Sequence, residues 1–259
     1  MSIVAAAVVP HSPLLLPSIA KQHAALFAQT TESLTRLAAD WYAAKPDAVM
    51  ILSPHGWLKN NDMAIHSAEQ FVGGFSDYGD MATTVKAIGG VAIMHQLATA
   101  AQREHWPIHI QTFDQLDYGT SVPLSFLLSA QPQIPTCPIL IGTRQPEALL
   151  RLAAVIREFA SSDRRRYLML ASCDMTRPDK HTPDARRRPT AEERAFSSAI
   201  VAVDPAQLTA IKPQATTCGY GPLLVLLGVL NGLVDDGIVE TFEAPLGVGL
   251  LTASFSFNA

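Results

Sequence analysis

The chain has 259 residues, 48% of them apolar, which is enough to bury the core of one large α/β domain. Its formal net charge of -4 excludes a sequence-wide attraction to nucleic acid or to an anionic membrane. The longest apolar run, residues 222–234, is too short to span a bilayer and is typical of a buried helix. We therefore expect one domain over residues 1–259, whose partner is a small molecule rather than nucleic acid or a membrane.

The first half of the chain predicts two buried strands separated by a helix. Residues 3–9 and 47–52 are continuous apolar runs, the pattern of strands that are covered on both faces. Residues 19–44, between these runs, carry an apolar stripe at helical spacing. Shorter strands are predicted at residues 64–66 and 108–110, on either side of a helix over residues 83–103 that a Gly-Gly pair interrupts.

From residue 137 onward, apolar strand-like runs alternate with amphipathic helical segments. The predicted strands cover residues 138–142, 167–172 and 247–255, and the predicted helices cover residues 146–161, 190–203 and part of the apolar run 222–234. Alternation of this kind favours a mostly parallel central sheet with helices on both faces. The predicted fold class is therefore a single-domain α/β fold.

Two arginine runs, residues 164–166 and 186–188, resemble anion sites. Charge runs beside helices and turns are usually solvated, so we expect exposed segments here, including a loop over residues 184–189. The glycine-rich turn at residues 219–222 lacks the Lys-Ser/Thr pair that a P-loop requires. These segments therefore predict no nucleic-acid partner.

Three cysteines, Cys137, Cys173 and Cys218, lie far apart, and none belongs to a CxxC pair. This spacing indicates neither a disulfide framework nor a structural zinc site. The first residues lack the basic segment and the cleavage site of a secretory leader. We expect reduced thiols and a cytoplasmic protein.

Two predicted strands end in the same way, with a proline followed by a histidine. Residues 8–11 read Val-Val-Pro-His, and residues 51–55 read Ile-Leu-Ser-Pro-His. Ligands of open α/β sheets bind outside the carboxyl ends of the strands, and neutral histidine is the commonest transition-metal ligand. We therefore predict that His11 and His55 lie at the ends of adjacent parallel strands and share one metal ion. The alternative is that each imidazole only caps a loop.

Six segments carry a further pattern: VPHSPLLLP at 9–17, SPHG at 53–56, LDYGTSVPL at 116–124, SCDMT at 172–176, CGYGPL at 218–223 and EAPLGVG at 243–249. In that order they resemble the landmarks of the class III extradiol ring-cleavage dioxygenases, the LigB-like superfamily that also contains the Memo proteins. The resemblance implies an α/β fold and a mononuclear non-haem Fe(II) that is held by two histidines and one carboxylate. It further implies a catecholate substrate, O₂ and an acid/base histidine. By position, His11 and His55 match the two histidine ligands.

The chain departs from the family pattern at a histidine that supports the site or binds substrate, and at the acid/base histidine. Tyr118 stands in an Asp-Tyr-Gly-Thr segment where relatives have Asp-His-Gly-Thr, and Arg177 stands where they have the acid/base histidine. Arginine stays protonated, so Arg177 suits the binding of an anionic ligand. Candidate catalytic residues are therefore His181, Asp174 and Tyr118, and candidate substrate-binding residues are Arg177 and Tyr118.

The third metal ligand also departs from the pattern. Relatives carry Glu-Cys-Gly where this chain has Thr217 followed by Cys218 and Gly219. Threonine is a poor ligand for Fe(II), so Cys218 becomes the candidate third ligand, which resembles the Memo arrangement. A thiolate favours Zn or Cu over Fe(II), so Zn or no metal are the alternatives to Fe(II). The other interpretation is that Cys218 is only a small buried residue at the start of a helix. Glu243 is another carboxylate near a predicted strand, and we expect packing to position it.

Three functions stay open from the sequence. The first is a divergent extradiol dioxygenase-like oxidoreductase that acts on a small aromatic substrate. The second is a catalytically degenerate, Memo-like binding or regulatory protein, because the carboxylate and acid/base positions are both changed. The third is a metal-assisted hydrolase that uses His11, His55 and Asp174. Because the third ligand and the acid/base position are both changed, we expect weak metal retention and slow ring cleavage. The oligomeric state stays open, and a homo-oligomer is one alternative.

Overall fold

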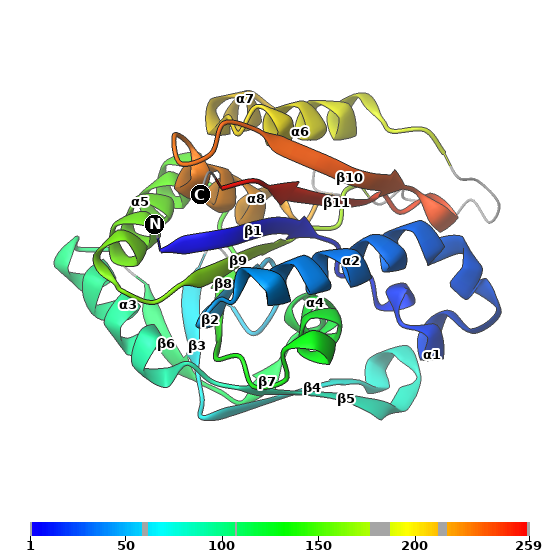
Figure 1. Cartoon of the computed structure of the whole chain (residues 1–259), viewed down its shortest axis with the longest axis horizontal. Helices are drawn as coiled ribbons and strands as arrows, with labels where there is room; N and C mark the ends of the chain where they lie inside the picture. The colour runs from blue at the N-terminus through cyan, green and yellow to red at the C-terminus, as the bar shows by residue number, and fades with distance from the viewer. Residues whose placement is uncertain (1, 59–61, 107, 177–186, 212–216, 258–259) are drawn as a thin grey trace.

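Two β-sheets and the helices packed on them organise the chain (Figure 1). The computed structural model describes residues 2–58, 62–106, 108–176, 187–211 and 217–257. Its strands are β1 (Ile3–Val9), β2 (Ala48–Ser53), β3 (Met63–Ser67), β4 (Gln70–Phe75), β5 (Asp80–Ile88), β6 (His109–Thr112), β7 (Gln115–Leu116), β8 (Thr136–Ile141), β9 (Tyr167–Ser172), β10 (Gly237–Glu243) and β11 (Leu250–Phe255). Its α-helices are α1 (Pro17–Ala20), α2 (Ala28–Ala44), α3 (Val91–Arg103), α4 (Tyr118–Ala130), α5 (Pro146–Ser162), α6 (Ala191–Val201), α7 (Pro205–Ala210) and α8 (Tyr220–Leu230).

The larger sheet within the described residues has eight strands in the order β10-β11-β1-β9-β2-β8-β3-β6. Its centre is parallel, through the pairs β1–β9, β9–β2 and β2–β8. The strands β2, β8 and β9 are buried at every position, as expected where helices cover both faces of a sheet. Parallel pairing brings the carboxyl ends of β1, β9 and β2 to the same edge.

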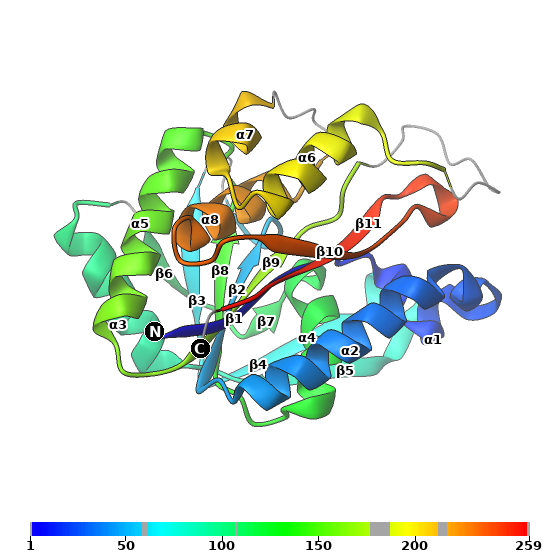
Figure 2. The same cartoon turned by 45° about the horizontal axis from the view of Figure 1, so that its top comes forward.

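Helices cover both faces of this sheet, which confirms the predicted fold class (Figure 2). One face carries α2 and α4, and the other carries α3, α5 and α8. Helix α8 packs against α5, β9 and β2, and nearly all its side chains are buried, as its apolar sequence predicts. Among the helices of the described residues, none has both the length and the apolar character needed to cross a membrane.

A smaller three-stranded sheet, in the order β5-β4-β7, packs against α4 and was not predicted. The prediction of one helix over residues 83–103 is wrong for its first part. Residues 80–88 form β5, which pairs antiparallel with β4, and α3 begins only at Val91. A side chain at Gly89 would overlap the carbonyl of Ala68, so the Gly-Gly pair marks the boundary between strand and helix rather than an interruption of the helix.

The helix predicted over residues 19–44 is also shorter than expected. Helix α2 begins at Ala28, and a 3₁₀ segment, Lys21–Phe27, separates it from α1. Lys21 has a φ of 52°, which lies outside the right-handed helical region and ends α1. The apolar stripe of residues 28–44 forms a helix as predicted, and it buries Leu34, Leu37 and Trp41 against the sheet.

Candidate functional site

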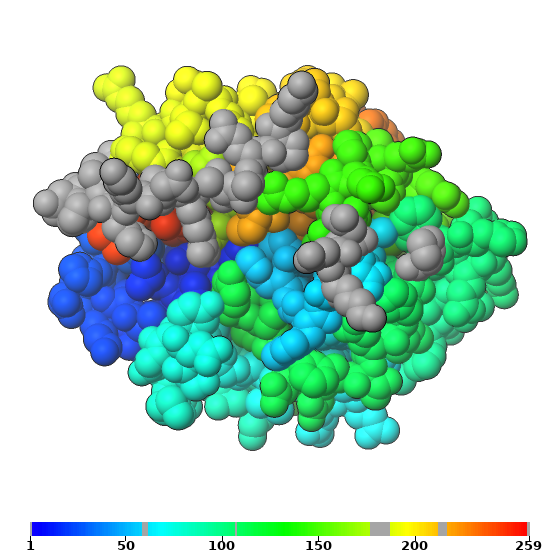
Figure 3. Space-filling view, turned by 180° about the vertical axis from the view of Figure 1, so that it is seen from behind, coloured from blue at the N-terminus to red at the C-terminus, as the bar shows by residue number. Residues whose placement is uncertain are grey.

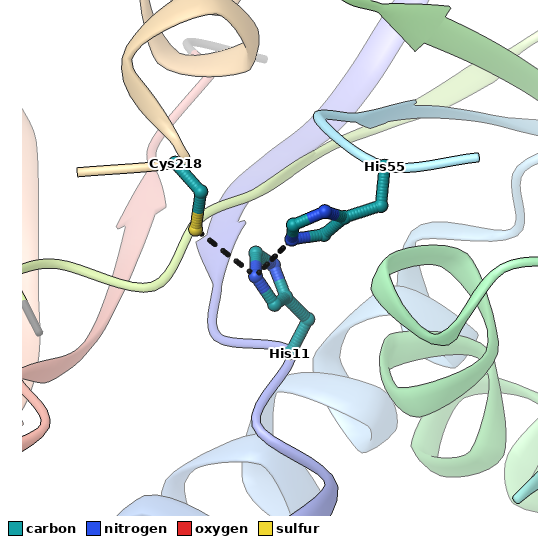
Figure 4. Close-up of side chains that lie close together, drawn as sticks. All are labelled: His11, His55 and Cys218. Atoms are coloured by element: carbon teal, nitrogen blue, oxygen red, sulfur yellow. Dashed lines mark hydrogen bonds between the residues drawn. The ribbon is translucent and has the colours of Figure 1, made fainter. Parts of the chain in front are cut away.

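The two histidines that follow β1 and β2 meet at the carboxyl edge of the large sheet. Their Nε2 atoms lie 3.1 Å apart, and the rings are perpendicular (Figure 4). The strands themselves are not adjacent, which corrects one part of the prediction: β9 lies between β1 and β2. His11 and His55 nevertheless point toward one another, so they come close enough to share a ligand.

Cys218 completes a group that we call the His–His–Cys cluster, made of His11, His55 and Cys218. Its Sγ atom lies 3.2 Å from His11 Nε2, and the three possible ligand atoms lie within 4.8 Å of one another. The thiol stands just before α8, and the next residue, Gly219, packs directly on Cys173. A Cβ atom at position 219 would overlap the side chain of Cys173, so this approach requires glycine.

Ser172, the last residue of β9, fixes the proton on His11. Its Oγ lies 2.8 Å from His11 Nδ1, and its hydroxyl donates to the carbonyl of Gly119 at 2.5 Å. Because a serine hydroxyl has only one proton, Ser172 must accept a hydrogen bond from the Nδ1–H of His11. The lone pair of His11 is therefore on Nε2, directed at His55 and Cys218, which is the state that binds a metal.

Asp174 is fully buried directly behind the cluster. One carboxylate oxygen accepts from the backbone N–H of His11 at 2.8 Å, and the other lies 3.7 Å from His11 Nε2. A buried negative charge at this distance favours a cation in the cluster. The backbone carbonyl of Asp174 also lies 3.8 Å from the thiols of both Cys173 and Cys218. Burial raises the pKa of Cys173 well above its ordinary value, so this second thiol stays protonated.

Tyr118 borders the cluster from the first turn of α4. Its hydroxyl lies 2.9 Å from His55 Nε2, and the two rings stack with centroids 4.4 Å apart. The preceding residue, Asp117, caps the helix by accepting from the backbone N–H of Thr120 at 3.0 Å and from the hydroxyl of Ser53 at 2.8 Å. The cap ties the start of α4 to the end of β2, which holds Tyr118 beside His55.

A cavity of about 270 Å³ opens beside His55 and Tyr118. Three segments line it: residues 55–57 after β2, Gly74 with residues 77–78 of the β4–β5 hairpin, and residues 116–118 before and at the start of α4. Figure 3 shows these segments, sky blue, cyan and green, meeting on one face of the molecule. Two larger depressions, of about 550 and 610 Å³, lie around the end of α5 and contain no residue of the cluster. We assign the site to the smaller cavity because its lining includes His55 of the cluster.

Five residues that the sequence singled out lie together here: His11, His55, Cys218, Asp174 and Tyr118. Arg177 and His181 lie outside the described residues. The sequence did not assign a role to Ser172, although a polar residue at the end of a buried strand was a usable signal. Tyr78, which lines the cavity, was missed because the β4–β5 hairpin was not predicted, and Trp57, two residues after His55, was not singled out.

Two residues from segments that the sequence analysis singled out have structural roles. Glu243 accepts from the backbone N–H of Thr30 at 3.0 Å and from its hydroxyl at 2.6 Å, so it caps α2, in line with positioning by packing. Arg187 belongs to a run expected to be solvated, and this expectation is wrong for it. Its guanidinium lies 2.6 Å from a carboxylate oxygen of Glu193, whose side chain is fully buried.

The donor set of the cluster fits a transition-metal ion. The two Nε2 atoms lie 3.1 Å apart, which is less than twice the metal–nitrogen distance of about 2.1 Å, so one ion can contact both. The unprotonated Nε2 of His11, the thiol of Cys218 and the buried carboxylate of Asp174 all suit a cation at this point. Imidazole and thiolate ligands are compatible with Fe, Zn or Cu, so the donors alone do not select the metal.

Comparisons with known proteins place the chain in a known family. Residues 5–240 match the family described as the catalytic LigB subunit of aromatic ring-opening dioxygenase. Protein CA_C1420 of Clostridium acetobutylicum is 21% identical, over 93% of this chain and 54% of that protein, so the chain spans about half the length of this curated relative.

A solved structure has the same fold. The crystal structure of uncharacterized protein JW3007 from Escherichia coli K12 aligns with a TM-score of 0.65 at 15% identity, covering 97% of this chain and 99% of that one.

Proposed function

This chain belongs to the LigB family of aromatic ring-opening dioxygenase catalytic subunits, and on that basis we propose that it is a metal-dependent oxidoreductase acting on a small, catechol-like aromatic. One observation carries the proposal: the Nε2 lone pair of His11, fixed by Ser172, converges with His55 Nε2 and Cys218 Sγ. The adjoining cavity supports it, because its walls include the rings of His55, Trp57 and Tyr118.

The proposed metal ligands are His11 Nε2, His55 Nε2 and Cys218 Sγ. A bound Fe(II) ion would supply electron transfer between an aromatic diol and O₂; Zn is the alternative that the thiolate of Cys218 favours. Asp174 holds the backbone of His11 and offsets the charge of a cation in the cluster, so we assign it a positioning role. Ser172 keeps the proton of His11 on Nδ1, away from the cluster.

Tyr118 is the group that we assign to the proton of the substrate hydroxyl. Its phenol lines the cavity and also lies 2.9 Å from His55 Nε2. A phenol can both donate and accept a hydrogen bond, which is what a group that orients a substrate hydroxyl must do. This role takes the place of the histidine that relatives carry at position 118, and His181 stays a candidate for the second proton transfer.

Metal retention tests the proposal directly. Purified protein is loaded with Fe(II) under anaerobic conditions, desalted and analysed for metal. We expect the wild type to retain part of one equivalent, in line with the weak retention expected from the sequence, and Cys218→Ala to lose at least tenfold in affinity. Cys137→Ala is the matched control, because burial in β8 raises the pKa of Cys137 to about 12 and keeps this thiol inert. Equal retention by both variants would contradict the proposed ligand set.

Turnover is measured on the loaded protein as O₂ uptake with a panel of simple catechols. We expect slow, metal-dependent uptake that Tyr118→Phe reduces at least tenfold without loss of metal. Tyr42→Phe is the control, because Tyr42 is exposed on α2. Uptake that is unchanged by Tyr118→Phe would show that another residue moves the proton.

A second function, a Memo-like binding or regulatory protein, is favoured by one observation: a thiol and not a carboxylate lies next to His11 Nε2, at 3.2 Å against 3.7 Å for Asp174. Such a protein would retain metal and bind a small aromatic without O₂ uptake. The double substitution Thr217→Glu and Arg177→His separates the two functions. If the wild type is inactive and this variant gains ring cleavage, then the binding function is correct.

A further inference from the structure

We infer that the cavity beside the His–His–Cys cluster prefers single-ring aromatic ligands that carry a positively charged substituent, and that Asp77 sets this preference. The inference rests on the proposed function, because it takes the hydroxyl end of the ring to face Tyr118 and the cluster. It adds the substrate class, which the ligand atoms of the cluster do not determine.

The shape of the cavity fits one aromatic ring. Its volume of about 270 Å³ lies just below the range of about 300–1,000 Å³ that is typical of small-molecule pockets. The stacked rings of His55 and Tyr118 form one wall, and Tyr78 meets Tyr118 edge-on with centroids 5.5 Å apart. Trp57 lines the opening, and 55% of its surface is exposed. Flat walls of this kind favour offset or edge-on contacts with a planar ligand.

The charges on the described part of the lining are all negative. Asp77 and Asp117 are its only ionisable groups besides His55 and the two tyrosines, and no lysine or arginine of the described chain lines it. The carboxylate of Asp117 is already engaged by Ser53 and Thr120.

Asp77 differs from Asp117, because it is exposed and makes no hydrogen bond or ion pair within the residues that the structure describes. Its charge is therefore available to a ligand.

Two attractive interactions would favour a cationic substituent of the ligand at this position. Asp77 lies in the short 3₁₀ turn Ser76–Tyr78 and lines the cavity together with Tyr78. An ammonium group there is attracted by the carboxylate and by the faces of the surrounding rings. A carboxylate substituent at the same place would be repelled. This preference is opposite to the anionic ligand that Arg177 suggested from the sequence.

Three monophenols of similar size separate charge from shape: 4-hydroxyphenethylamine, neutral 4-ethylphenol and 4-hydroxyphenylacetate. Monophenols lack the second hydroxyl of a ring-opening substrate, so their binding is measured without turnover. Calorimetry on the purified protein without added metal should show the amine binding about threefold tighter than 4-ethylphenol and the acid about threefold weaker, as expected for one exposed charge pair. Asp77→Asn should remove both differences, whereas Asp40→Asn, which deletes an exposed charge on α2, should leave them unchanged.

Fluorescence locates the bound ligand. Trp41 and Trp106 are buried, whereas Trp57 lines the cavity, so ligand-induced quenching should disappear in Trp57→Phe while binding by calorimetry persists. The inference is overturned if the acid binds as tightly as the amine, if the preference survives Asp77→Asn, or if no monophenol binds. None of these results depends on metal retention or O₂ uptake. Failure of the charge preference with normal metal retention therefore refutes the inference alone, and loss of metal retention with a normal preference refutes the proposed function alone.

Discussion

Replacing Ser172 with alanine tests how the orientation of His11 supports the cluster. Ser172 links the Nδ1–H of His11, at 2.8 Å, to the carbonyl of Gly119, at 2.5 Å, and all three residues are buried. Alanine leaves a buried donor and a buried acceptor without this partner, at about 1–3 kcal/mol each. We expect the free energy of unfolding to fall by about 2–6 kcal/mol. We also expect metal affinity to fall about 10- to 100-fold, because the imidazole is no longer held in the required tautomer.

Urea unfolding gives the stability change, and calorimetric titration with metal gives the affinity. Ser33→Ala is the matched control, because Ser33 Oγ lies 2.7 Å from the hydroxyl of Thr252 in a buried pair between α2 and β11. The control should lose stability without losing metal affinity. If Ser172→Ala binds metal as tightly as the wild type, then the hydrogen bond to Nδ1 does not orient the ligand, and our assignment of the His11 tautomer is refuted.

Two further substitutions test the supports of the site. Arg187→Ala leaves the buried carboxylate of Glu193 without its ion-pair partner and should cost about 3–5 kcal/mol of stability at about pH 7. Burial alone raises the pKa of Glu193, but the hydrogen bonds that its carboxylate accepts from Arg187, Thr176 and Thr190 together lower the pKa by more. The pKa of Glu193 therefore lies below its ordinary value of 4.5. The ion pair therefore stabilises the fold above about pH 4.5, and this stabilisation is lost as the pH falls. Urea unfolding should show a smaller difference in the free energy of unfolding between wild type and variant in acid than at about pH 7. An equal difference in acid and at about pH 7 would contradict the ion pair. Gly219→Ala should reduce metal affinity at least tenfold in the calorimetric titration with metal, because the added methyl group would overlap Cys173. Gly74→Ala is the control and should retain the metal, because the space at its Cβ position is open. Equal metal affinities of the two variants would refute the steric argument.

The central strands could be predicted from the sequence because burial on both faces makes them continuously apolar. The predicted limits match β1 and β9 and differ by one residue at the ends of β2. The order of the strands could not be predicted in the same way. The insertion of β9 between β1 and β2 depends on contacts between residues more than a hundred positions apart, and no local pattern records them.

The edge strands and the hairpin were harder because their composition is ambiguous. Residues 80–88 contain Ala, Thr and Lys and fit either a helix or a strand until β4 pairs with them. The strand β10 is only partly buried and has a weak apolar signal. A local pattern does not define elements whose conformation is decided by a neighbouring strand.

In the candidate site too, some residues could be predicted from local sequence patterns and others depend on contacts between distant segments. The strand-Pro-His pattern was enough to single out His11 and His55, and the order of family motifs added Asp174, Tyr118 and Cys218. The role of Ser172 depends on the carbonyl of Gly119, which is 53 residues away in the chain. Such a role becomes visible only when the fold brings the two residues together.

The most direct test of the account is the position of a metal ion in crystals of the anaerobically loaded protein, located by anomalous diffraction. We predict one peak at about 2.1 Å from the Nε2 atoms of His11 and His55 and about 2.3 Å from Cys218 Sγ. A peak elsewhere, or no peak at this point in fully loaded protein, would contradict the proposal that these three residues form a metal site.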